Sequence, residues 1–77
     1  MKPIVPHHNY HPASWSAQAR QMCDEQVRSI NIGMGTIAGA SKFFQTSYRH
    51  KIIRSRAAKR FGRLVREGKV HERSESY

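Results

Sequence analysis

The sequence predicts an all-α fold: an extended N-terminal arm followed by one long or kinked helix, with a single transmembrane span and no independent globular core. All three prolines lie within the first 13 residues of the 77-residue chain. Beyond them, apolar or small residues recur every three or four positions, which is the period of one helical face. A chain of this length with a single cysteine can form neither a large core nor an internal disulfide.

Residues 1–13 are expected to form an extended arm, because proline fixes φ and restricts the residue before it. The arm contains His7, His8 and His11 but no cysteine or carboxylate. Zinc sites in proteins are built from denser sets of such ligands. We therefore interpret this segment as a surface arm and expect no metal and no cofactor.

Residues 14–28 are predicted to form an amphipathic helix. Ser14 can cap it, since a serine hydroxyl accepts a hydrogen bond from an unpaired amide of the first turn. The apolar face begins with Trp15, Ala19 and Met22 and continues at the same spacing as far as Phe44 and Tyr48. This face is expected to pack against a neighbouring element.

Residues 29–48 carry one charged side chain, Lys42. Twenty helical residues span about 30 Å, which matches the hydrocarbon core of a bilayer. Glycine is unfavourable in a water-exposed helix but allows close packing of helices in lipid, and Gly35 and Gly39 form a GxxxG pair. The segment is therefore predicted to be a transmembrane helix that packs through Gly33, Gly35, Ala38 and Gly39. A hinge between two short helices of a soluble subunit is the alternative.

Residues 49–70 are predicted to continue as a basic amphipathic helix with Gly68 as its stop, followed by a polar tail at 71–77. From residue 49 onward the chain has ten basic and three acidic residues, a net charge of +7, so this segment carries most of the net charge of +9 of the whole chain. A basic helix directly after a span favours contact with anionic lipid such as cardiolipin. The candidate lipid-contacting residues are Arg49, Lys51, Arg54, Arg56, Lys59, Arg60 and Arg63.

The same charges could instead bind RNA phosphates, with Tyr48 and Phe61 as stacking residues. No motif for specific base recognition is present. The positive charge and the Pro/His-rich arm support this alternative, a basic mitochondrial ribosomal or RNA-binding protein that threads through ribosomal RNA.

Arg28, Gly35 and Gly39, followed by Ala40-Ser41-Lys42-Phe43, resemble subunit e of the mitochondrial ATP synthase. The resemblance implies a single-span accessory subunit of the mitochondrial inner membrane that packs against subunit g through the two glycines. Such a subunit would help to dimerise the synthase. Other small single-span subunits of respiratory complexes share this organisation of one span followed by a charged helix.

No catalytic constellation is evident. Cys23 has no histidine nearby in sequence, and Asp24 and Glu25 would point in different directions on a helix. We therefore predict a non-enzymatic accessory subunit of an inner-membrane respiratory complex, most simply ATP synthase, with other subunits of that complex and anionic lipid as partners.

Overall fold

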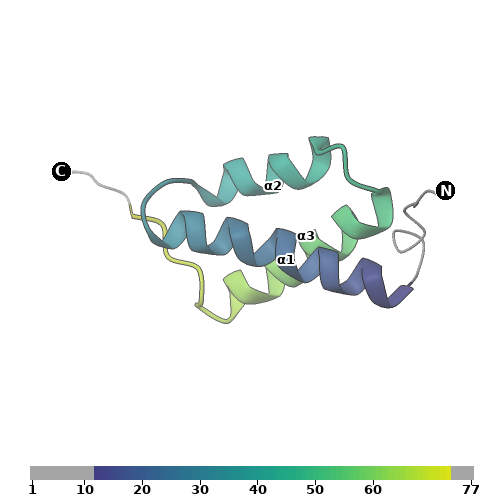
Figure 1. The fold of residues 1–77 in the computed structure, drawn as a ribbon. Helices are drawn as coiled ribbons and strands as arrows, with labels where there is room; N and C mark the ends of the chain where they lie inside the picture. Colours follow the sequence, from purple (N-terminus) through teal and green to yellow (C-terminus); the bar gives the residue numbers. More distant parts are fainter. Residues whose placement is uncertain (1–11, 74–77) are drawn as a thin grey trace, which may run out of the picture.

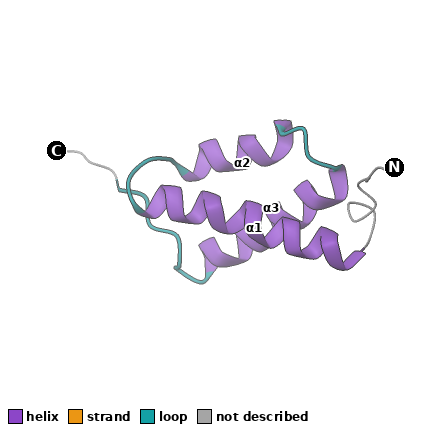
Figure 2. Cartoon of the chain, viewed as in Figure 1, coloured by secondary structure: helices purple, strands orange, loops and turns teal. Residues whose placement is uncertain are grey.

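The computed structural model describes residues 12–73, which form three helices joined by short loops. Helix α1 covers Pro12–Asn31, α2 covers Ile37–Thr46 and α3 covers Lys51–Arg66. Helices α1 and α3 lie against each other, and α2 lies along one side of this pair, mainly against α3 (Figure 1). Within the described residues there are helices and loops but no strands (Figure 2).

The prediction of one long helix without a core of its own is wrong. Buried side chains from all three helices form a shared apolar core, and Phe44 of α2 meets Phe61 of α3 edge to face with ring centroids 5.3 Å apart. The core residues are Ala19, Met22, Cys23, Ile30, Ala40, Phe44, Ile53, Ala57, Phe61 and Val70. The chain therefore folds back on itself twice.

The predicted transmembrane span is also wrong. None of the helices in the described part of the chain has both the length and the apolar character that crossing a bilayer requires. Residues 29–48 comprise the end of α1, a loop and α2. Helix α2 has 10 residues. At about 1.5 Å per residue it is roughly half as long as the hydrocarbon core is thick.

Gly33 ends α1 in a Schellman motif. Its φ of +87° lies in the left-handed region, its N–H donates to the carbonyl of Ile30, and the N–H of Met34 donates to the carbonyl of Ser29. Glycine is the residue that most readily adopts this conformation after a helix. The chain then turns toward α2, so Gly33 is a helix stop rather than part of a helix-packing surface.

Gly68 ends α3 in the same way, with φ of +76° and N–H groups of Gly68 and Lys69 donating to the carbonyls of Val65 and Leu64. This confirms the predicted stop, although α3 itself ends at Arg66. At the other end of the chain, α1 begins at Pro12, because a proline without an N–H is tolerated in the first turn. The remainder of the predicted extended arm, residues 1–11, lies outside the described residues.

The first turns of α2 and α3 are both capped by side chains. Thr36 Oγ1 accepts a hydrogen bond from the Gly39 N–H at 2.9 Å, and Glu72 Oε2 accepts one from the Ile37 N–H at 2.7 Å. His50 Nδ1 accepts one from the Ile52 N–H at 3.1 Å. Because such caps satisfy amides that the helix leaves unpaired, they fix where α2 and α3 start.

Candidate nucleic-acid interface

A depression along one side of α3 is lined by basic residues alone. The buried residues Ile53, Ala57 and Phe61 are four positions apart and face the core. The basic residues recur at intervals of three or four positions. They therefore lie above one another in a stripe next to the buried face of the helix. They line an open depression of about 400 Å³, here called the basic groove, whose residues are Arg56, Lys59, Arg60, Arg63 and Arg66.

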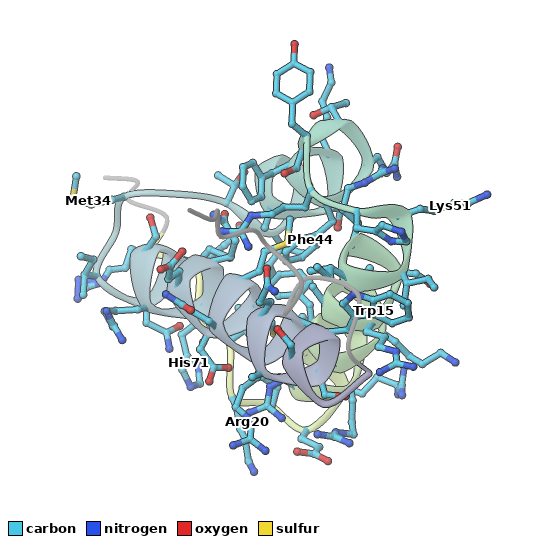
Figure 3. All side chains as sticks on the ribbon, turned by 45° about the vertical axis from the view of Figure 1, so that its right-hand side comes forward. Trp15, Arg20, Met34, Phe44, Lys51 and His71 are labelled. Carbon is cyan, nitrogen blue, oxygen red and sulfur yellow. The ribbon has the colours of Figure 1, made fainter. Side chains whose placement is uncertain are left out.

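Helix α1 borders the basic groove. Arg56 Nη1 donates a hydrogen bond to Ser16 Oγ at 2.9 Å, and Arg60 Nε donates to Asp24 Oδ1 at 3.2 Å. Arg20 lies midway between Ser16 and Asp24, one helical turn from each. Figure 3 shows the Arg20 side chain pointing outward, whereas Phe44 points inward among the helices. Arg20 is not among the residues that line the groove.

Few acids offset this positive charge. Asp24 is engaged by Arg60, and both side chains are partly exposed. At the far end of α3, Glu67 lies 3.9 Å from Arg63 Nε and 3.3 Å from Lys69 Nζ. Within residues 12–73, Arg56, Lys59 and Arg66 take part in no ion pair. Most of the cationic surface is thus available to an external anion.

The sequence-predicted basic residues divide into two groups. Arg56, Lys59, Arg60 and Arg63 meet in the basic groove, whereas Arg49, Lys51 and Arg54 lie where α2 turns into α3. Arg54 is used internally: its Nη1 donates to the carbonyls of Gln45 at 2.7 Å and Phe44 at 3.4 Å, and its Nε donates to that of Arg49 at 3.0 Å.

Lys51 and Arg54 border a second, smaller depression of about 210 Å³ between α2 and α3. Arg66, which also lines the basic groove, was not among the sequence-predicted basic residues. The signal that could have identified it was its spacing of three from Arg63.

The four glycine and alanine residues predicted to pack helices do not lie on one helix. Gly33 and Gly35 are in the loop before α2, whereas Ala38 and Gly39 are in its first turn. A Cβ at Gly35 would lie 3.4 Å from Ser29 Oγ, and one at Gly39 would lie 3.0 Å from the capping Thr36 Oγ1. Their small size therefore serves a close chain reversal within the molecule.

The two predicted stacking aromatics have opposite environments. Phe61 is buried in the core, where it contacts Phe44. Tyr48 is 104% exposed, in the turn between α2 and α3. Of the two, only Tyr48 can reach an external partner.

Cys23 is fully buried, and burial raises the pKa of its thiol above the ordinary value of 9.0. The charge of Asp24 raises this pKa further, while Arg60 and Arg63 lower it. A buried thiol held in its protonated form is a poor nucleophile. No group of three potential metal ligands occurs among residues 12–73, and the histidines of the predicted arm lie outside this range.

Comparisons of the chain with protein-family models, with curated proteins and with solved structures found no match.

Proposed function

We propose that this chain is a non-catalytic RNA-binding protein that holds the phosphate backbone in the basic groove. The observation that carries the proposal is the separation of apolar and basic side chains on α3. Ile53 and Phe61 are buried in the core, Leu64 and Val65 pack partly buried against it, and the groove beside them is lined by cations. Phosphate contacts supply most of the affinity when a protein binds nucleic acid without reading its bases.

The distribution of apolar side chains favours RNA over a lipid surface. A helix that binds a bilayer inserts an apolar face beside its cations. Of the exposed large hydrophobic residues in the described part of the chain, Ile32 and Met34 lie in the loop after α1, Phe43 lies on α2 and Tyr48 lies in the turn after α2. None of them lines the basic groove. The groove can therefore attract phosphates but offers nothing to insert into acyl chains.

The form of the groove suits an extended polyanion. Its cations recur about once per helical turn from Arg56 to Arg66, roughly 15 Å along the axis at about 1.5 Å per residue. Arginine predominates, and its guanidinium forms paired hydrogen bonds to phosphate oxygens. Together with the net charge of +9, this geometry supports a role inside a ribonucleoprotein.

A pair of matched double variants tests the proposal. Lys59→Gln with Arg66→Gln removes two groove cations, and Arg28→Gln with Lys42→Gln removes one arginine and one lysine elsewhere. Arg66 and Arg28 each lie in the last turn of a helix, so the effect on helix termini is matched. Binding to labelled RNA is followed by fluorescence anisotropy across a range of salt concentrations.

The groove variant should bind RNA more weakly and reduce the slope of log affinity against log salt by about 1.4, at about 0.7 for each lost phosphate contact to a single strand. The control pair should change the slope much less. Equal slopes for the two variants would overturn the proposal. Preferential binding to cardiolipin-containing vesicles, without competition by RNA, would instead favour the lipid interpretation.

The role of accessory subunit in a mitochondrial ATP synthase, and the inner-membrane location that goes with it, stay predictions from the sequence resemblance. These predictions relied on a GxxxG pair, Gly35 and Gly39, on one packing helix. In the structure Gly35 lies outside α2, the helix that contains Gly39.

A further inference from the structure

We propose that Tyr48 is a stacking platform for an unpaired base, so that the protein prefers single-stranded segments of RNA to duplex. This inference rests on the proposed function and adds a base contact to backbone binding. Tyr48 is 104% exposed. Within the described residues it makes no ring contact or hydrogen bond that would hold its side chain against the protein.

The turn that carries Tyr48 is firmly held. The Ser47 N–H donates to the Phe43 carbonyl at 2.9 Å, and the Arg49 N–H donates to Ser47 Oγ at 3.2 Å. The Arg54 guanidinium then joins the turn to the end of α2 through the carbonyls of Gln45 and Arg49. Because the backbone is fixed on both sides of Tyr48, it loses little conformational freedom when RNA binds. This small entropy cost favours affinity.

The charges around this turn suit a nucleic acid. Arg49 and Lys51 flank the turn, and no acidic residue occurs between Glu25 and Glu67. The turn leads directly into α3, whose first groove residue, Arg56, lies five residues beyond Lys51. To reach Tyr48, a flexible strand that leaves the groove at Arg56 would pass around the start of α3, beside Lys51 and Arg49.

The expected ligand follows from the chemistry of stacking. An aromatic ring stacks on the face of a base, and in a duplex both faces of an internal base are already covered by its neighbours. Stacking is also tolerant of sequence, because every base presents such a face. We infer a preference for unpaired RNA of any sequence rather than for one motif.

The experiment compares Tyr48→Ala, Tyr48→Phe and Met34→Ala in the full chain. Met34→Ala is the matched control, because it removes an exposed apolar side chain from the other loop, where Met34 is 74% exposed and points outward in Figure 3. The probes are a labelled unstructured RNA and the duplex formed with its complement. Affinities are measured by anisotropy, and folding is checked by circular dichroism and thermal unfolding.

Tyr48→Ala should weaken binding to the unstructured RNA about 5- to 150-fold, the equivalent of about 1–3 kcal/mol for one stacked base. Its affinity for the duplex should change less than about twofold, and both Tyr48→Phe and Met34→Ala should retain the single-strand affinity of the original chain. Photo-cross-linking of a 5-iodouridine RNA should also yield an adduct on Tyr48, identified by mass spectrometry.

The outcomes separate the two proposals. If the unaltered chain binds neither RNA, the proposed function fails. If it binds both and Tyr48→Ala leaves the single-strand affinity intact, or weakens both probes equally, backbone binding survives and the stacking proposal is overturned. An equal loss of affinity for the unstructured RNA in Tyr48→Phe would also overturn it, because phenylalanine retains the ring face.

Discussion

The imidazole ring of His50 stacks on the indole of Trp15, with ring centroids 5.2 Å apart and the ring planes inclined by 20°. The same imidazole accepts a hydrogen bond from the Ile52 N–H through Nδ1 and caps α3. One side chain thus couples the start of α1 to the start of α3.

Replacing His50 should therefore destabilise the fold. His50→Ala removes both the cap and the stacked ring, and we expect a loss of about 1–2 kcal/mol in the free energy of unfolding, mostly from the cap. His50→Asn can keep an acceptor for the Ile52 N–H and should lose less. Urea unfolding followed by the fluorescence of Trp15, the chain's one tryptophan, gives both values. Equal stability of the two variants would show that the cap contributes nothing.

Asp24 is expected to weaken RNA binding, because its carboxylate engages Arg60 at the basic groove. Asp24→Asn should raise the affinity for RNA up to about fivefold, while costing no more than about 1 kcal/mol of stability, as is usual for a partly exposed ion pair. Glu25→Gln is the matched control: it removes the same charge from an exposed neighbour that is hydrogen-bonded to Gln21 instead. Anisotropy titrations compare them, and equal gains would indicate a general charge effect.

Stability at alkaline pH should depend on Cys23. Burial raises the pKa of its thiol above the ordinary 9.0, so the folded chain keeps this proton to higher pH than the unfolded chain does. The resulting stabilisation is complete below about pH 9 and is lost as the pH rises through the folded-state pKa. The free energy of unfolding should therefore fall more steeply in this range for the original chain than for Cys23→Ala. Parallel curves for the two proteins would contradict this expectation.

The effect on stability of replacing a glycine by alanine should depend on the backbone conformation of that glycine. Gly33→Ala forces a Cβ into the left-handed region and should cost about 1–2 kcal/mol. Gly62→Ala is the contrasting variant, because Gly62 lies inside α3 with its nearest neighbour atom, on Arg66, 3.7 Å from the added Cβ. It should stabilise the chain by about 0.4–1 kcal/mol. Thermal unfolding decides between these signs.

The carboxylate of Glu72 should stabilise α2 specifically. It accepts a hydrogen bond from the Ile37 N–H at the helix N-terminus, where the helix dipole also favours a negative charge. Glu72→Gln should cost about 0.3–1 kcal/mol and speed hydrogen exchange of the first amides of α2. Glu67→Gln, which removes a carboxylate next to Arg63 and Lys69, serves as the control. Uniform acceleration across all three helices would argue against a local role.

Helical periodicity identified much of the core. Ala19, Met22 and Phe44 were placed on one apolar face, and all three are buried. Tyr48 was placed on the same face but is fully exposed, because the turn after α2 changes the direction of the chain before that position is reached. Periodicity thus predicted burial correctly within α1, whereas Phe44 is buried on a different helix from the one to which that face was assigned.

The ends of the helices were harder to predict, because glycine can serve several purposes. Gly33 and Gly39 are compatible with close packing in lipid, with a helix stop or with a capped first turn. The distinction depended on neighbours: the Thr36 hydroxyl accepts from the Gly39 N–H, and Glu72, 35 residues beyond Ile37, caps the same helix. The Thr36 cap is local, but a partner as distant as Glu72 cannot be inferred from local spacing. The basic groove was largely predictable, since its residues are consecutive members of one helical stripe.

Residues 69–72 bridge the first two helices: the Asn31 side chain donates to the Lys69 carbonyl and accepts from the His71 N–H, and Glu72 caps α2. These partners emerge late during synthesis. Helices α1 and α2 therefore gain these hydrogen bonds only after the ribosome has translated at least as far as Glu72 and that segment has left the exit tunnel. Until then, the Asn31 side chain lacks these two backbone partners and the Ile37 N–H lacks its cap.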